Sequence, residues 1–211
     1  MWLIDAIVER LLIFLTRICT GILVYGAPPQ TGARVYFANH ASHLDLMVIL
    51  SAFPQRLRGR LHPVAARDYW EKTWLRRYLA RRVLHCVFLD RRNAVQASQA
   101  LRQLARMLRE GESILIFPEG TRGDGTQIGR FHAGLHHLLR QAPEVPLTPV
   151  YLGGLSRTLP KGEFVPAPNM STIQFGEDLH WQEGESKEDF LARCRESLLQ
   201  MKEQTNEMAV E

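Results

Sequence analysis

The chain has 211 residues, of which 45% are hydrophobic and 23% are charged, and its formal net charge is +4. This length suits one α/β domain and is short for two, and the apolar content excludes an intrinsically disordered chain. The mild positive charge favours an anionic partner, which by charge alone is a phosphorylated lipid, a membrane surface, coenzyme A or nucleic acid.

The three cysteines, Cys19, Cys86 and Cys194, lie far apart and form no CxxC or Cys/His spacing. This pattern indicates neither a disulfide framework nor a zinc site. We therefore expect reduced thiols, a cytoplasmic location and no bound metal.

Residues 1–25 are strongly apolar but contain four charged side chains. A helix that spans a bilayer needs about 20 residues with few charges, and each charge near the bilayer centre costs roughly 2.5–3.5 kcal/mol. Because Asp5, Glu9 and Arg17 recur on one helical face, we predict an amphipathic helix at the membrane interface, followed by a globular domain over residues 26–211. A helix buried in the core of that domain is the alternative.

Short apolar runs alternate with segments of helical periodicity along the rest of the chain. The predicted strands are residues 35–38, 86–89, 113–117, 147–152 and 173–175. The predicted helices are residues 42–53, residues 94–110 and a C-terminal helix that begins near Ser186. This alternation predicts an α/β fold, a single domain with a largely parallel central sheet flanked by helices.

Residues 56–92 carry eleven Arg or Lys residues against three Asp or Glu residues, interleaved with aromatic residues such as Tyr69 and Trp74. Anionic membrane surfaces attract basic side chains, and aromatic rings settle at the depth of the lipid headgroups. We therefore expect a membrane surface with anionic lipids as a partner, on the cytoplasmic face. Nucleic acid is not expected because no nucleic-acid-binding module surrounds the stretch, and a plain solvated helix face is the remaining alternative.

Three successive predicted strands end at side chains that can do chemistry. The first delivers His40, the second is followed by Arg91, and the third is followed by Glu119 and Arg122. Sites in open parallel sheets gather at the carboxyl ends of the strands. The sequence therefore predicts that these residues share one site.

His40 and Asp45 are five positions apart across a predicted strand-to-helix turn. An imidazole in this position can remove a proton from a hydroxyl near neutral pH, and a carboxylate on its other nitrogen orients the ring. The nucleophile in such an arrangement is the hydroxyl of the substrate. The alternative for Asp45 is a helix-capping box with Ser42, in which the carboxylate bonds back to a free backbone amide.

Residues 117–122 read Phe-Pro-Glu-Gly-Thr-Arg. A turn with a carboxylate and a guanidinium, in which glycine allows close backbone approach, suits an anionic substrate whose phosphate binds Arg122. Glu119 is predicted to orient that substrate or to hold Arg122, and backbone amides near Gly120 are expected to stabilise an oxyanion. An ordinary Pro-Glu-Gly turn with solvated charges is the alternative.

These segments together resemble a known family. The Asn-His-x4-Asp segment at residues 39–45 and the block at residues 117–122 resemble the two strongest motifs of the glycerophospholipid acyltransferases, whose type members are 1-acylglycerol-3-phosphate O-acyltransferases (lysophosphatidate acyltransferases). Residues 87–91, Val-Phe-Leu-Asp-Arg, resemble the arginine motif of the family, and residues 145–150 resemble its proline-rich strand. The resemblance covers roughly residues 35 to 152.

The resemblance implies a reaction and roles for individual residues. It implies transfer of a fatty acyl group from acyl-CoA or acyl carrier protein to the free hydroxyl of a lysophospholipid, 1-acylglycerol-3-phosphate above all, without a cofactor or a metal. His40 is expected to act as the general base and Asp45 to assist it. The residues expected to bind the acceptor are Arg91, Glu119, Gly120, Thr121 and Arg122.

Two departures from the family pattern leave the identity of the acceptor open. The arginine motif of the family usually begins with a glycine where this chain has His85, and relatives often have a lysine where this chain has His132. A non-catalytic lipid-binding or membrane-tethering protein of the same fold is the alternative from another functional class. A transacylase that needs no thioester is the alternative within the enzymes.

Overall fold

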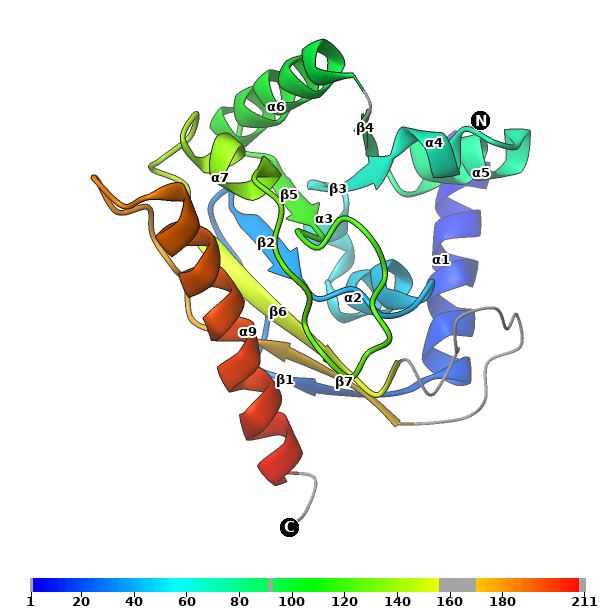
Figure 1. Cartoon of the computed structure of the whole chain (residues 1–211). Coiled ribbons are helices and arrows are strands. Elements are labelled where there is room, and N and C mark those ends of the chain that lie inside the picture. The colour runs from blue at the N-terminus through cyan, green and yellow to red at the C-terminus, as the bar shows by residue number, and fades with distance from the viewer. Residues whose placement is uncertain (1, 91–92, 156–169, 209–211) are drawn as a thin grey trace.

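Strand β2 (Val35–Ala38) lies near the middle of a seven-stranded sheet in the computed structural model, which describes residues 2–90, 93–155 and 170–208 (Figure 1). The other strands are β1 (Gly21–Tyr25), β3 (Leu61–Ala66), β4 (Val87–Leu89), β5 (Ser113–Ile116), β6 (Leu147–Gly153) and β7 (Met170–Phe175). The helices are α1 (Trp2–Cys19), α2 (Asp45–Ala52), α3 (Gln55–Arg58), α4 (Arg67–Trp70), α5 (Trp74–Tyr78), a π-helix η1 (Leu79–Val83), α6 (Ala94–Arg109), α7 (Gly134–Leu139) and α9 (Lys187–Met208).

The strand order is β1-β7-β6-β2-β5-β3-β4. Strands β6, β2, β5, β3 and β4 run parallel to one another, whereas β7 is antiparallel to β6 and pairs in parallel with β1. The predicted α/β fold with a largely parallel sheet is therefore confirmed. Because β2, β5, β3 and β4 point the same way, the segments that follow them emerge at one edge of the sheet.

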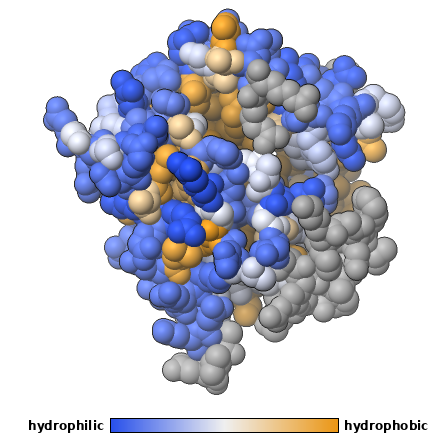
Figure 2. Space-filling model, in the orientation of Figure 1, coloured by the Kyte–Doolittle hydropathy of each residue, from blue (hydrophilic) through white to orange (hydrophobic). Residues whose placement is uncertain are grey.

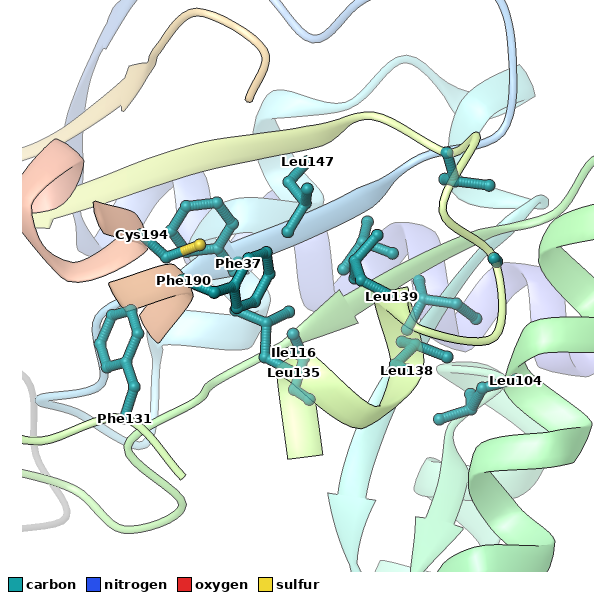
Figure 3. Packing of buried hydrophobic residues seen from close by; sticks show 14 of the residues in the cluster. Phe37, Leu104, Ile116, Phe131, Leu135, Leu138, Leu139, Leu147, Phe190 and Cys194 are labelled. Carbon is teal, nitrogen blue, oxygen red and sulfur yellow. The ribbon is translucent and has the colours of Figure 1, made fainter. Parts of the chain in front are cut away.

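Side chains of β2 alternate between the two helical layers, as the pleat of a strand requires. Val35 and Phe37 are fully buried among residues of α6, α7 and α9, and Figure 3 shows Phe37 beside Phe190 of α9. Tyr36 and Ala38 face the opposite layer, which contains α2 and part of α1. Full burial of a side chain such as Phe37 contributes about 1.5–3 kcal/mol, so both layers stabilise the strand that precedes the site.

Two strands of the sheet were not predicted. Strand β3 contains Pro63, which lacks the N–H that a central strand normally donates. In the structure Pro63 is the last β3 residue paired with β5, and pairing with β4 begins at Val64, so the proline stands where β3 changes partners. Strand β1 lies within the segment that was predicted to continue the N-terminal helix.

The N-terminal prediction of one helix over residues 1–25 is therefore corrected. Helix α1 ends at Cys19, and residues 21–25 pair with β7 as part of the sheet. Glycine at position 21 and the β-branched residues Ile22 and Val24 favour this change from helix to strand. The segment is thus structurally continuous with the rest of the domain.

Helix α1 turns its polar side chains toward the domain. Asp5 accepts hydrogen bonds from Tyr78 and Arg82, each 2.8 Å long, and Glu9 accepts one of 2.8 Å from Arg58. The hydrogen bonds from Arg82, and next from Tyr78, lower the pKa of Asp5. These contacts fix the helix on the domain by its charged face.

The opposite face of α1 is apolar and exposed. We define the apolar face as seven exposed side chains of this helix together with two of α5, whose Tyr78 bonds to Asp5 of α1. They are Leu3, Ile4, Ile7, Leu11, Phe14, Leu15, Ile18, Trp74 and Leu75. Within the described residues, no helix is both long and apolar enough to cross a bilayer.

Candidate active site

Asn39 fixes the end of strand β2, directly before His40. Its side-chain amide donates to the backbone oxygen of Leu152 at 2.9 Å and its side-chain oxygen accepts from the Leu152 amide at 2.8 Å. These two bonds extend the pairing of β2 with β6 by one residue after the strand has ended. Sequence reasoning assigned no role to Asn39, although its place directly before the candidate base, in the Asn-His-x4-Asp segment, was a signal.

His40 and Asp45 form a hydrogen-bonded pair at the start of α2. His40 Nδ1 lies 2.7 Å from Asp45 Oδ2, and Asp45 is fully buried while the His40 side chain is 24% exposed. A carboxylate only accepts hydrogen bonds, so the proton of the pair lies on Nδ1. The other ring nitrogen, Nε2, then has a free lone pair, which is the state a general base requires.

Asp45 also makes the bond to the Ser42 amide that the capping alternative predicted, although α2 has Leu44 as its N-cap and no side-chain cap hydrogen bond. Its Oδ2 accepts from the backbone amides of Ala41 at 2.7 Å and Ser42 at 2.9 Å, and these amides precede the helix that begins at Asp45 itself. The reciprocal half of the capping box is absent, because the Ser42 hydroxyl accepts from Leu44 instead. One carboxylate oxygen therefore orients the imidazole and shapes the turn that carries it.

Glu119 holds the backbone of His40. Its Oε1 accepts from the His40 amide at 2.8 Å and its Oε2 accepts from the Gly129 amide at 2.8 Å. Glu119 is 6% exposed. The contacts of its carboxylate are thus with the chain itself, and its predicted contact with an acceptor stays a prediction.

Two glycines, Gly123 and Gly129, complete the contacts around His40 and Glu119. The Gly123 amide donates to the His40 carbonyl at 2.8 Å, so both backbone polar groups of His40 are bonded to the segment that follows β5. A Cβ atom at Gly129 would lie 2.8 Å from Glu119 Oε2, which is too close for any side chain. The site therefore needs glycine at position 129 for a steric reason.

The block after β5 forms a tight turn at the site. Gly120 has a φ of +69° and its amide donates to the Phe117 carbonyl at 3.0 Å. This amide is used within the turn, and the expected oxyanion role of backbone amides near Gly120 stays a prediction. Thr121 and Arg122 line a cavity that His40 also lines.

A largely apolar cavity of about 660 Å³ adjoins His40. Figure 2 shows hydrophobic surface in a hollow below α6, on a face that is otherwise mostly hydrophilic. The polar lining residues include His40, His43, Arg122 and His132. The apolar lining residues include Val64, Trp70, Leu89, Ala97, Leu101 and Leu135.

The structure brings together His40, Asp45, Glu119 and Arg122, as the strand ends predicted. Arg91, the predicted arginine-motif residue, lies outside the described residues, although strand β4 that precedes it ends at the same edge of the sheet. The ring of Phe117 stacks on His40 with centroids 4.4 Å apart. Phe117 therefore packs on a face of the imidazole, whereas Asp45 bonds to its edge at Nδ1.

The backbone conformation at His85 is the one that suits the glycine of the family pattern. Its φ is +51°, a left-handed conformation that glycine adopts without strain and that few other residues adopt. The turn that leads from η1 into β4 therefore has the backbone shape expected of glycine, and histidine accepts it here. The carbonyl oxygen of His85 lies 3.1 Å from Nδ1 of His62 on β3, which ties the turn to the sheet.

Comparison with known proteins agrees with this geometry. A family model described as Acyltransferase matches residues 22–153, more than half of the chain. The chain belongs to the acyltransferase family. The match contains β1 to β6, and therefore the two segments that form the His40 site.

Curated relatives in this family carry a more specific name. The probable 1-acyl-sn-glycerol-3-phosphate acyltransferase of Mycoplasma pneumoniae is 36% identical over 118 residues, which are 55% of this chain and 44% of that protein. The human 1-acyl-sn-glycerol-3-phosphate acyltransferase alpha is 31% identical over 126 residues, which are 59% of this chain and 42% of that protein. The matched region thus spans about half the length of these relatives.

The fold also occurs in a solved structure of the family. The crystal structure of the 1-acyl-sn-glycerophosphate acyltransferase PlsC from Thermotoga maritima superposes with a TM-score of 0.75 at 22% identity, covering 96% of this chain and 81% of that one. The likeness includes the N-terminal helix and the C-terminal helix, which lie outside the family model. It shows that the architecture described above is that of an acyltransferase-family fold.

Proposed function

We propose that the chain transfers a fatty acyl group from a thioester, acyl-CoA or acyl carrier protein, to the free hydroxyl of a lysophospholipid, 1-acylglycerol-3-phosphate in particular. The observation that carries this proposal is the His40–Asp45 pair, 2.7 Å apart, beside an apolar cavity. A general base beside an apolar cavity suits a substrate with a reactive polar end and a long hydrocarbon chain. The names of the relatives support the choice of acceptor.

In the proposed reaction, His40 Nε2 takes the proton of the acceptor hydroxyl as that oxygen attacks the carbonyl carbon of the thioester. The C–O bond of the new ester forms, the C–S bond breaks, and the proton held by His40 passes to the leaving thiolate. Asp45 stabilises the imidazolium that exists between these two transfers. No covalent acyl-enzyme is needed, because the nucleophile belongs to the acceptor.

Arg122 is proposed to bind the phosphate of the acceptor. A guanidinium forms two parallel hydrogen bonds to phosphate oxygens, which sets both position and orientation. Arg91, Gly120 and Thr121 are proposed to support the same acceptor. Glu119 contributes by holding the His40 backbone, as its contacts indicate.

Thiol release from acyl-CoA tests the function directly. The wild-type chain should release CoA in the presence of 1-acylglycerol-3-phosphate, and His40→Ala should lower the rate by about 10²–10⁴-fold, the usual effect of losing a general base. Membrane binding of the variant should be unchanged, because His40 is not part of the apolar face. The exposed His180→Gln serves as the matched control.

The same assay separates the alternatives. A tethering protein would show no thiol release in the wild type, and a transacylase would form product when acyl-CoA is omitted. A panel of lysophospholipid acceptors with one acyl-CoA, followed by identification of the lipid product, decides the acceptor. Replacing acyl-CoA by acyl carrier protein decides the donor.

We further propose that the apolar face docks on a membrane that contains anionic lipids. This face places nine large apolar side chains in solvent, which is costly unless another apolar phase covers them. Leu3 on α1 and Trp74 on α5 are each 75% exposed, and the basic pair Arg76 and Arg77 follows Trp74 two residues later. Tryptophan with neighbouring cations is the combination that lipid headgroups favour.

Vesicle sedimentation tests this docking. The double variant Ile7→Glu and Leu11→Glu should weaken binding to phosphatidylglycerol-containing vesicles at least about tenfold, since each change removes roughly 1.5–3 kcal/mol of apolar burial. Val95→Glu is the matched control, because Val95 is 66% exposed but lies on α6. Equal loss in both variants would contradict the assignment of the face.

A further inference from the structure

His43 lies three residues after His40 and lines the same cavity. Its Nδ1 is 3.2 Å from the phenolic oxygen of Tyr69, and the two rings stack with centroids 5.7 Å apart and an interplanar angle of 27°. Tyr69 is on α4, directly after β3, so the contact joins the segment that follows β2 to the segment that follows β3. The mechanism above gives His43 no role.

A cation completes the arrangement around this ring. The guanidinium carbon of Arg76 lies 4.6 Å from the centroid of the Tyr69 ring, so Tyr69 contacts both Arg76 and His43. A cation on an aromatic face contributes about 0.5–1 kcal/mol at an exposed site. The Tyr69 ring is therefore held by two contacts, and its hydroxyl lies within hydrogen-bond distance of one nitrogen of His43.

The surroundings favour the neutral form of His43. Partial burial is the largest cause that lowers the pKa of His43, and the positive charges of Arg122, His40 and Arg76 lower it further, while Asp45 acts in the opposite direction. A neutral imidazole carries one N–H, and a nitrogen that accepts from tyrosine leaves that N–H on the other nitrogen. Covalent geometry directs Nε2 away from Tyr69.

We propose that His43 is an acceptor-binding residue whose Nε2–H donates to a phosphate oxygen of the acceptor, with Tyr69 as the residue that positions its ring. This proposal rests on the proposed function and extends it to a specific contact. Arg122 and His43 then bind the same phosphate, one as a cation and the other as a neutral donor. Together they hold the acceptor with its hydroxyl near His40.

The phosphate suits this position better than the carbonyl of the thioester does. Three positive or potentially positive groups, Arg122, Arg76 and His40, act on the His43 ring, so the local field favours an anion. The thioester carbonyl has no net charge and gains less from this field. A neutral donor also keeps its hydrogen bond over the pH range in which the phosphate loses its second proton.

Steady-state kinetics in mixed micelles tests the contact. His43→Leu should raise KM for 1-acylglycerol-3-phosphate by about 10–100-fold, the usual effect of losing a hydrogen bond to a charged group, with kcat and KM for acyl-CoA largely retained. His43→Gln keeps an N–H donor and should recover part of the loss. An unchanged acceptor KM, a loss confined to kcat, or a raised KM for acyl-CoA would each overturn the proposal, the last in favour of a donor phosphate.

Nitrogen NMR of ¹⁵N-histidine-labelled protein tests the role of Tyr69 without any turnover. In the wild type the His43 proton should lie on Nε2, and glycerol 3-phosphate should shift that resonance. Tyr69→Phe keeps the stacked ring but removes the hydroxyl, so the tautomer preference should weaken, whereas the control Tyr25→Phe should change nothing. A proton found on Nδ1 in the wild type, or no shift with glycerol 3-phosphate, would refute the inference.

The two proposals fail in different ways. If the wild-type chain acylates no lysophospholipid, the proposed function fails, while the NMR titration still decides whether His43 binds a phosphomonoester. If the chain is active and His43→Leu has the acceptor KM of the wild type, only the His43 contact fails.

Discussion

The carboxylate of Glu119 accepts a hydrogen bond of 2.8 Å from the backbone amide of His40, 79 residues earlier in the chain. Together with the bond from Gly123 to the His40 carbonyl, it fastens the segment after β5 to the segment after β2. The position of the candidate base is therefore set by two sequence motifs at once. A change in the second motif should act on the first through the backbone.

Glu119→Gln should reduce both stability and turnover. A glutamine side chain has one acceptor oxygen, so it cannot accept from the amides of His40 and Gly129 together and instead places an NH₂ group against one of them. We expect the free energy of unfolding to fall by about 1–3 kcal/mol, measured by urea denaturation, and kcat to fall more than acceptor affinity. Glu110→Gln, at the exposed end of α6, is the control. Unchanged stability with a raised acceptor KM would instead indicate direct acceptor binding.

Gly129→Ala should destabilise the chain, and Gly134→Ala should not. A Cβ atom at position 129 meets Glu119 Oε2 at 2.8 Å, whereas a Cβ atom at position 134 meets nothing within 4 Å. Displacing the carboxylate breaks its backbone bonds, so we expect a loss of about 1–3 kcal/mol for Gly129→Ala. Gly134→Ala adds helix propensity to α7 and should be neutral or stabilising by up to about 1 kcal/mol. Thermal and urea denaturation of both variants compare them, and equal effects would contradict the steric explanation.

Glu9→Ala should loosen α1 from the domain. Arg58 donates to Glu9 at 2.8 Å, and the Arg58 side chain is only 9% exposed, so the change leaves a nearly buried guanidinium without its carboxylate. The expected loss in unfolding free energy is about 1–3 kcal/mol. Arg10→Ala on the same helix removes only an exposed contact of 3.4 Å to Gln55, and the expected change is within about 0.5 kcal/mol. Equal losses in the two variants would show that Glu9 and Arg58 do not anchor the helix.

His136 should make stability depend on pH. Burial is the main cause that lowers the pKa of this imidazole below 6.5. As the pH falls below about 6.5, the unfolded chain binds a proton at His136 that the folded chain does not bind, so the free energy of unfolding decreases until the folded pKa is reached. Well above pH 6.5, His136 is neutral in both the folded and the unfolded state and adds no pH dependence.

His136→Leu should therefore lose less stability than the wild type between about pH 7.5 and about pH 5.5, measured by urea denaturation at both values. His136 packs against Trp181 and Phe190, so leucine keeps the site apolar. The exposed His180→Gln should follow the wild type. A variant with the same pH dependence as the wild type would assign the effect to other groups.

Much of the fold could be predicted from local patterns. Short-range sequence is enough to predict strands β2, β5, β6 and β7, which appear as apolar runs, and helices α6 and α9, which appear as periodic segments. Burial of one face of a helix or strand produces this hydrophobic pattern in the sequence. Strand β3 could not be predicted this way because Pro63 opposes it, and its place depends on which neighbour each residue pairs with. Strand β1 was hidden because its apolar residues continue those of α1.

The sequence by itself determined which chemical groups follow which strands, and parallel strands then bring His40, Glu119 and Arg122 to one edge. Only the tertiary structure decided what each group contacts. The partner of Glu119 is 79 residues away, and the direction of the α1 faces depends on Arg58 and Arg82. Hydrogen bonds of this kind are set by the position of backbone and side-chain atoms in space, and the spacing of residues along the chain does not record them.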